Sequence, residues 1–336
     1  MVSKAQEKTL AAVARAIVAP SKGILAADES SGTIKKRLDS IGVPSTETTR
    51  RDWRQLLFTA MGGGDFISGV ILFDETIRQK ATDGRSLVEV LQSQGIIPGI
   101  KVDTGAKSLA GAAGEQITEG LDGLRDRLSE YVNLGAKFTK WRAVISIGEV
   151  VPSDYCLHVN AHALGRFAAL SQEAGLVPIV EPEVLMDGSH DIECCYEVTE
   201  RTLRIVFDEL AAQSVSLDGM LLKPNMVLSG KEALKRAAPP EVAEATISCF
   251  KPVVPAALPG IVFLSGGQSD DEATENLNAM NRGERDFPWE LSFSYGRGLQ
   301  ATPLKRWGGQ AENVSAAQKA FLDRARQTSA AREGKL

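Results

Sequence analysis

The stretch DGMLLKP, residues 218–224, is an apolar run that ends in a lysine followed by a proline. Pro224 disfavours helical backbone at the preceding residue, so we expect Lys223 to lie at the end of a β-strand. Seven other apolar runs contain or end in polar or charged residues: GILAADE (23–29), GVILFDE (69–75), GIKVD (99–103), FTKWRAV (138–144), VPIVEPE (177–183), GIVFLSGG (260–267) and ELSFSYG (290–296). The sequence thus predicts eight strands, which begin roughly 30–45 residues apart along most of the chain.

Amphipathic segments with helix-capping residues separate most of these runs. Ser45 and Thr46 can cap the segment that follows them, and Ser269 begins another whose first turn is acidic. A third, from Ser153 to Ala174, stops at Gly175. Strands that alternate with helices favour a parallel sheet, and eight such strands are the number in a closed barrel.

The predicted fold is therefore a single (β/α)8 TIM barrel of the α/β class. Residues 8–19 and 314–331 form the flanking N-terminal and C-terminal helices in this prediction. The sequence has no visible linker, repeat or low-complexity segment, so we expect residues 1–336 to form one domain.

Composition excludes several classes of function. The chain has 336 residues, 43% of them hydrophobic and 24% charged, which is typical of a soluble globular protein. The net charge of −5 and the dispersed basic residues argue against nucleic-acid binding. No apolar run reaches the roughly 18 residues of a membrane span, and the N-terminal residues lack a signal-peptide core. Four cysteines without framework spacing are typical of a reducing cytoplasm.

Charged side chains gather where the predicted strands end. Residues two apart on a strand share a face, so Lys140 can point with Arg142, and Glu181 with Glu183. In a TIM barrel such groups converge at the carboxyl-terminal mouth, where active sites of this fold lie. Solvated strand ends are the alternative for any one residue, but they account poorly for so many charges at once.

Two glycine-rich loops follow the seventh and eighth predicted strands. They are SGGQS (265–269) and SYGRG (294–298), and loops at these places often bind phosphate in such barrels. Glycine N–H groups can approach phosphate oxygens closely, and Arg297 offers a forked donor. The pair of loops therefore predicts a phosphate site.

Lys223 is the candidate nucleophile. A free lysine has a pKa of about 10.4, and a drop of about 3 units, which frees the amine, takes roughly 4 kcal/mol. A second ammonium group about 4 Å away supplies about that much at an effective dielectric constant of 20, and Lys140 is the candidate. Burial lowers the pKa further. Glu181 and Glu183 can then shuttle protons, although a structural ion pair of Lys223 with either glutamate is the alternative.

Over roughly residues 8–334, the chain resembles class I fructose-bisphosphate aldolase. The resemblance rests on the strings IVAPSKGILAADES, KRLDSIG, GVILF, GIKVD, LDGL, KWR, PIVEPE, LLKPNM, FLSGGQS, FSYGR and LQATPLKRWGG. It implies a barrel fold, a homotetramer, and reversible cleavage of fructose 1,6-bisphosphate to dihydroxyacetone phosphate and glyceraldehyde 3-phosphate. Phosphorylated ketoses and trioses are then the partners, with no cofactor and no metal.

The resemblance also implies residue roles. Lys223 forms the Schiff base with C2 of the ketose, and Glu181 is the general acid and base, with Glu183 beside it. Asp28 takes the proton of the C4 hydroxyl, and Lys140 supports charge and proton transfer. The C1 phosphate is held by Ser265, Gly266, Gly267, Ser294, Gly296 and Arg297. The C6 phosphate is held by Arg37, Lys101 and Arg142, with Ser30 and Thr33 nearby.

One departure concerns the end of the chain. Animal members carry a longer C-terminal tail that ends in a tyrosine, which assists proton exchange at the enamine and favours the bisphosphate. This sequence ends in AREGKL, and its last tyrosine is Tyr295. How the enamine is protonated therefore stays open. The preference among fructose 1,6-bisphosphate, fructose 1-phosphate and sedoheptulose 1,7-bisphosphate stays open too.

Three alternatives compete with this interpretation. A zinc-dependent aldolase would need a metal site, and His158 and His162 stand four apart on a predicted helix, with His190 far away. A barrel kept only as a binding scaffold is expected to lose the charges at its mouth, and these are present. Other Schiff-base barrels, such as transaldolases, share the lysine chemistry but lack the strings above.

Overall fold

The computed structural model describes residues 3–283 and 286–336, and within them eight parallel strands close into a barrel. Around the barrel the strands run in the order β1, β10, β9, β8, β7, β6, β3 and β2. Their bounds are Gly23–Ala27 (β1), Ile67–Leu72 (β2), Ile97–Lys101 (β3), Phe138–Ile145 (β6), Val177–Val184 (β7), Leu221–Leu222 (β8), Gly260–Phe263 (β9) and Glu290–Tyr295 (β10). All eight predicted strands are confirmed, and β8, where the sequence analysis began, is the shortest.

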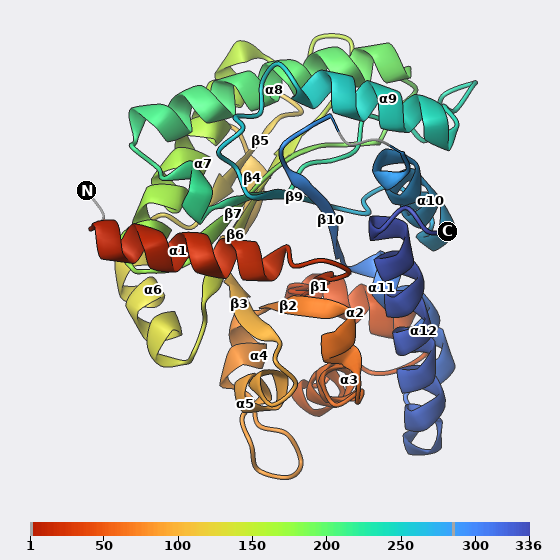
Figure 1. The fold of residues 1–336 in the computed structure, drawn as a ribbon. Helices are drawn as coiled ribbons and strands as arrows, with labels where there is room; N and C mark the ends of the chain where they lie inside the picture. Colours follow the sequence, from red (N-terminus) through yellow and green to blue (C-terminus); the bar gives the residue numbers. More distant parts are fainter. Residues whose placement is uncertain (1–2, 284–285) are drawn as a thin grey trace.

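Helices surround the barrel and connect its strands (Figure 1). Their bounds are Lys4–Ile17 (α1), Ser31–Asp39 (α2), Glu47–Phe58 (α3), Asp74–Arg78 (α4), Leu87–Gln92 (α5), Leu124–Asn133 (α6), Asp154–Glu173 (α7), Ile192–Ala212 (α8), Pro239–Phe250 (α9), Asp270–Asn281 (α10), Arg297–Trp307 (α11) and Val314–Arg332 (α12). The predicted caps hold: Thr46 caps α3, Ser153 caps α7 and Ser269 caps α10, each through its side chain. No described helix is long and apolar enough to cross a membrane.

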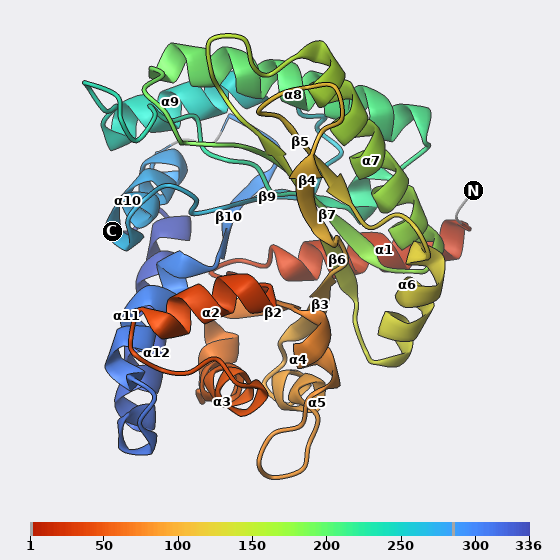
Figure 2. The same ribbon diagram turned by 180° about the vertical axis from the view of Figure 1, so that it is seen from behind.

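One end of the barrel is closed by α1. This helix crosses in front of the barrel in Figure 1 and lies behind it in Figure 2. Leu10, Ala14 and Ile17 on α1 are buried in one cluster with barrel residues such as Phe138 and Leu221. Packing against the barrel therefore holds α1 in place, and the opposite, carboxyl-terminal end is left for the cavity described below.

The barrel interior is filled by large side chains that rest on glycines. The ring of Phe138 lies so close to Gly99 on the neighbouring strand that a Cβ there would stand 2.2 Å from Phe138 Cε2. A side chain at Gly99 would force this ring out of place, which is costly in a densely packed interior. A second, larger apolar cluster fills the space between the strands and the surrounding helices.

A two-stranded antiparallel hairpin, which the sequence analysis did not predict, leaves the barrel after β3. It consists of β4 (Gly105–Ser108) and β5 (Gln116–Glu119). Its sequence, GAKSLAGAAGEQITE, is rich in glycine and alanine and lacks a clear apolar alternation. Gly105 and Ala106 of this hairpin line the cavity at the carboxyl-terminal end of the barrel.

Candidate active site

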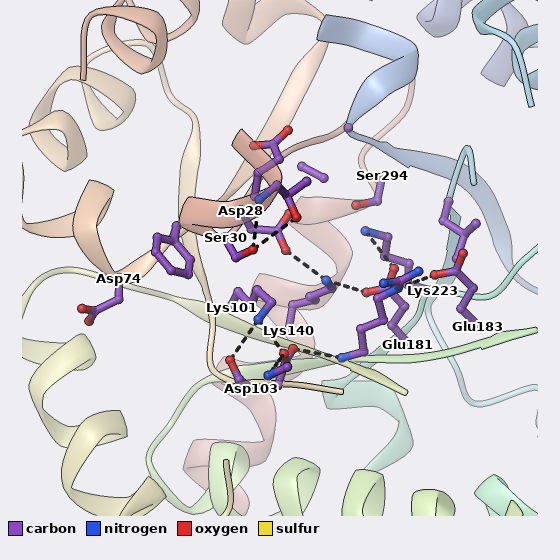
Figure 3. Close-up of a pocket in the computed structure, with 18 of the residues that line it drawn as sticks. Asp28, Ser30, Asp74, Lys101, Asp103, Lys140, Glu181, Glu183, Lys223 and Ser294 are labelled. Atoms are coloured by element: carbon purple, nitrogen blue, oxygen red, sulfur yellow. Dashed lines mark hydrogen bonds and ion pairs between the residues drawn. The ribbon is translucent and has the colours of Figure 1, made fainter. Parts of the chain in front are cut away.

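The carboxyl-terminal ends of the barrel strands surround a cavity of about 1040 Å³ (Figure 3). The structure brings to its wall nearly all the residues predicted for the site: Asp28, Ser30, Thr33, Arg37, Lys101, Lys140, Arg142, Glu181, Glu183, Lys223, Ser265, Gly266, Ser294, Gly296 and Arg297. Gly267 is not among the lining residues. It has φ +78°, and a Cβ there would stand 2.6 Å from the side chain of Met186. Gly267 thus shapes its loop rather than the wall.

Strand register places several of the predicted site residues opposite one another. On β6 and β7, Arg142 pairs with Glu181 and Val144 pairs with Glu183, so both glutamates lie beside the cationic face of β6. The backbone N–H of Lys223 donates to the carbonyl of Val180 at 2.8 Å, which continues the β8 ladder by one residue. As predicted, residues two apart on a strand share a face, and this brings Glu181 and Glu183 together with Lys140 and Arg142.

Glu181 bridges the two buried lysines. Its Oε1 lies 3.3 Å from Nζ of Lys223, and its Oε2 lies 2.8 Å from Nζ of Lys140. Nζ of Lys140 also donates to Oδ2 of Asp28 at 2.9 Å. The Lys223 and Glu181 side chains are each 4% exposed, so water screens these interactions little. The four groups form one charged network, seen as the chain of contacts at the centre of Figure 3.

The pKa values of this network diverge. Burial by itself raises the pKa of Asp28 and of Glu181, but the neighbouring lysines, Lys140 foremost, outweigh burial and hold both below their ordinary values. Burial lowers the pKa of Lys140, yet Asp28 and Glu181 more than reverse this effect and raise it. Three of the four groups are thereby held in their charged forms at neutral pH.

Lys223 is the group whose pKa moves toward the neutral form. Burial has the largest effect and lowers the pKa of Lys223; the Glu181 carboxylate opposes this shift, and the Lys140 ammonium adds to it. The net result is a pKa below the ordinary value. Burial is thus the main cause of the lowered pKa of Lys223, whereas the sequence favours Lys140 as the main cause. An amine with this setting is suited to attack a carbonyl carbon.

Glu183 lies next to this network but is paired elsewhere. Its carboxylate accepts a hydrogen bond from Nε of Arg142, and a Cβ on Gly266 would stand 2.7 Å from its Oε1. The Glu183 side chain is 7% exposed, while that of Arg142 is 40% exposed. Glu183 therefore holds Arg142 at the cavity wall and backs the Gly266 loop.

The two glycine-rich loops meet on one side of the cavity. A Cβ on Gly298 would stand 3.4 Å from Oγ of Ser265, so the loops after β9 and β10 touch. Arg297 is the first residue of α11, which places helix N–H groups beside it. The buried hydroxyl oxygen of Ser294 has no hydrogen-bond partner among the described residues. Helix N–H groups, a guanidinium group and an unpaired hydroxyl can all donate hydrogen bonds to an anion, so this side of the cavity is suited to bind one.

Further polar groups line the cavity away from these loops. Ser30 caps α2 and its hydroxyl lies 3.2 Å from that of Thr33, while Nζ of Lys101 lies 2.5 Å from Oδ1 of Asp103. Arg37, on α2, has its Nη2 3.8 Å from the place where a Cβ on Gly296 would stand. Arg37 therefore reaches toward the SYGRG loop from the side of α2.

Sequence reasoning missed part of the wall. Asp74 and Asp103 stand out in the sequence only as strand ends, and the other polar residues of this wall, on α4 and α6, give no signal: Arg78, Arg127, Glu130 and Tyr131. On those helices charged residues are indistinguishable from a solvated surface. Only the fold shows that they face the cavity.

Comparison with known proteins decides the family. The family model described as fructose-bisphosphate aldolase class-I matches residues 9–336. The chain belongs to the class I fructose-bisphosphate aldolases. It is 57% identical to a probable fructose-bisphosphate aldolase class 1 of Xanthomonas axonopodis, over 97% of this chain and 98% of that protein. It is 55% identical to the cytosolic fructose-bisphosphate aldolase 6 of Arabidopsis thaliana, over 97% and 90%.

A solved structure agrees with this assignment. The fructose-bisphosphate aldolase of Plasmodium falciparum, determined in complex with TRAP and a small-molecule inhibitor, matches with a TM-score of 0.97 and 47% identity. The match covers 99% of this chain and 96% of that one. As a class I aldolase the chain is a lyase that cleaves fructose 1,6-bisphosphate through a Schiff base, without a metal.

Family membership overturns the rival interpretations. A class I aldolase is neither a zinc-dependent aldolase nor a transaldolase, and nothing in the family points to a barrel without catalysis. Among the described residues, no group of three or more His, Cys, Asp or Glu is placed to hold an ion, and His162 instead lies 3.2 Å from Glu209. Tyr295 is buried, and its hydroxyl donates to the carbonyl of Ala273 at 2.7 Å, away from the cavity.

Proposed function

We propose that Lys223 is the amine that forms the Schiff base with C2 of the ketose. Its buried position and lowered pKa support this role, because the neutral amine is the nucleophile. The contact of Nζ with Oε1 of Glu181, at 3.3 Å, is the single observation that carries the proposal. It gives the amine a partner for each proton transfer between carbonyl, carbinolamine and imine.

Glu181 and Lys140 are the proton-handling pair in this proposal. Glu181 takes the proton that the Lys223 amine loses as the carbinolamine forms and donates it to the departing hydroxyl, and the reverse reaction runs through the same transfers. Lys140 stays charged between Glu181 and Asp28 and stabilises the negative charge on both. Glu183 acts on this pair through its hold on Arg142 and its contact with the loop of Gly266.

Asp28 is the proposed base for the C4 hydroxyl. Its pKa is held below the ordinary value, so the carboxylate is ready to accept a proton when the C3–C4 bond breaks. The electrons of that bond move into the protonated imine, which becomes an enamine, and the aldehyde leaves as glyceraldehyde 3-phosphate. The imine is the electron sink, so no metal is needed for this step.

The ends of the cavity are the proposed phosphate sites. The loops that carry Ser265, Gly266, Gly267, Ser294, Gly296 and Arg297 hold the C1 phosphate. The side chains of Arg37, Lys101 and Arg142 hold the C6 phosphate, with Ser30 and Thr33 near α2. Touching loops, a helix N-terminus and an unpaired Ser294 hydroxyl support the first assignment, and a cationic lining supports the second.

A steady-state assay tests these roles. Lys223→Arg keeps the positive charge but cannot supply a neutral amine, so kcat should fall by about three orders of magnitude or more. Lys319→Arg is the matched control, because Lys319 is exposed, pairs with Asp323 on α12 and does not line the cavity. Retained activity in Lys223→Arg would refute the assignment. Wild-type activity should also survive EDTA, and its loss with recovery on added zinc would contradict a metal-free reaction.

The assembly, the cellular location and the domain organisation complete the proposal. Homotetramers are expected from the family, and the names of plant relatives as cytosolic aldolases support a cytoplasmic enzyme. The barrel runs from β1 to β10 and supports one domain over residues 1–336. Light scattering on a sizing column tests the assembly: a mass of about four chains of 36.0 kDa is expected, and a monomer would contradict it.

A further inference from the structure

Glu29 follows Asp28 directly but belongs to a different set of contacts. Its side chain is 5% exposed and takes no part in the Lys140 and Lys223 network. Its carboxylate accepts hydrogen bonds from Nη1 of Arg37 and Nη2 of Arg54, and from Nε2 of Gln300 at 2.8 Å. A buried carboxylate with three donors is a fixed point in the wall of the cavity.

The three donors come from three different helices. Arg37 lies on α2, Arg54 on α3 and Gln300 on α11. Gln300 closes the network, because its Oε1 accepts from Nε1 of Trp53 at 3.1 Å and from Nη1 of Arg54 at 3.3 Å. Its Nε2 also donates to the carbonyl of Ala26 on β1 at 2.8 Å. The side chain of Gln300 is thus bound at both ends.

The charges in this set are unequal. One carboxylate faces two guanidinium groups, so the set carries a net positive charge. Arg54 is 3% exposed and donates hydrogen bonds to Glu29 and Gln300. Arg37, by contrast, is 26% exposed and lines the cavity. Nη1 of Arg37 donates to Glu29, and among the described residues no side chain binds the other guanidinium nitrogens of Arg37, which lines the cavity. The net positive charge of the Glu29, Arg37 and Arg54 side chains therefore faces the cavity through Arg37.

We propose that Glu29 is a positioning residue that holds Arg37 ready for a substrate phosphate, with Arg54 and Gln300 fixing its carboxylate. An arginine side chain loses much rotamer freedom when it binds an anion, and an ion pair formed beforehand reduces that loss. Gln300 lies one turn after Arg297 on α11, so the same carboxylate also links Arg37 to the helix that carries the second phosphate arginine. This inference rests on the proposed role of Arg37 as a phosphate ligand.

A rival account gives Glu29 the opposite effect. A carboxylate bound to Arg37 could compete with the phosphate and weaken substrate binding. The two accounts predict KM changes of opposite sign when the carboxylate is removed. Glu29→Gln alone leaves the buried Arg54 without a counter-charge and can prevent folding. The double variant Glu29→Gln with Arg54→Met removes both buried charges and leaves Arg37 unheld.

The experiment measures kcat and KM for fructose 1,6-bisphosphate in four proteins: wild type, the double variant, Arg37→Ala, and the three substitutions together. Glu75→Gln is the control, because Glu75 binds Arg50 of the same α3 helix at 2.8 and 2.5 Å, outside the cavity lining. Circular dichroism and a melting curve establish that each protein is folded. KM for fructose 1-phosphate is measured alongside.

Positioning predicts that the double variant raises KM for the bisphosphate about tenfold, as for one misplaced charge-assisted hydrogen bond, with kcat within about twofold. The added substitutions should change KM less than about twofold once Arg37 is alanine. An unchanged or lowered KM in the double variant, while Arg37→Ala raises it, overturns positioning and leaves the role of Arg37 intact. An unchanged KM in Arg37→Ala overturns both.

Discussion

Replacing Lys140 by methionine isolates the like-charge repulsion on Lys223. Both ammonium groups contact the same Glu181 carboxylate, at 2.8 and 3.3 Å, so the two nitrogens are at most about 8 Å apart. At an effective dielectric constant of 20, Coulomb's law then gives at least about 2 kcal/mol, which is roughly 1.5 pKa units. The substitution also frees Glu181 to act on Lys223 alone, and this too raises the pKa of Lys223. Burial remains, so the pKa should rise without returning to that of a free lysine.

Single-turnover trapping of the imine across pH measures this shift. The fraction of Lys140→Met trapped with borohydride in a short pulse should follow a curve displaced toward alkaline pH by at least about one unit. Lys140→Arg keeps the charge but not the compact shape, and should displace the curve less while still impairing catalysis. Lys101→Met removes a cavity ammonium that does not contact Glu181, and should leave the curve in place. An unmoved curve for Lys140→Met would show that burial alone lowers the pKa of Lys223.

Three further predictions concern the phosphates and the buried acid. Arg297→Ala should raise KM for phosphorylated ketoses about tenfold to a hundredfold, since a charge-assisted hydrogen bond contributes about 1.5–3 kcal/mol; an unchanged KM would remove Arg297 from the phosphate site. Arg37→Ala should impair cleavage of fructose 1,6-bisphosphate far more than that of fructose 1-phosphate, and equal losses would show that Arg37 is not at the C6 end. Because the folded-state pKa of Asp28 is depressed, its stabilising contribution is complete above the unfolded pKa of about 3.9 and is lost as pH falls below it. In urea unfolding, the stability difference between wild type and Asp28→Asn should therefore narrow by roughly 1 kcal/mol per pH unit below about 3.9, and a constant difference would contradict the assigned pKa direction.

The fold could be predicted from the sequence because the strand pattern, the helix caps and the number of strands all indicate the same barrel. Eight apolar runs contain or end in polar residues, and the capped segments between them have helical lengths. The β4–β5 hairpin was missed because its strands are short, and most of their residues are not buried. The length of β8 was not predictable either. The strand spans only Leu221 and Leu222, although the apolar run begins at Met220.

The residues at the strand ends could be predicted, whereas those that support them could not. Lys140 and Glu181 stand out because charges on apolar strands are unusual. Arg54 lies on an ordinary amphipathic helix, and nothing in RRDWRQ distinguishes it from Arg50 and Arg51, which are only partly buried. Its role follows from a contact with Glu29 that joins residues 25 positions apart. Burial of Lys223, the main cause of its lowered pKa, is likewise a property of the closed barrel.

Reductive trapping tests the central claim most directly. Incubating the protein with fructose 1,6-bisphosphate, reducing with borohydride and sequencing the modified peptide by mass spectrometry locates the amine that forms the imine, because only an imine is reduced in this way. The account predicts one modified position, Lys223, in the peptide that contains LLKPNM. A stable adduct on Lys140 or another lysine, or cleavage of the substrate with no adduct at all, would contradict it.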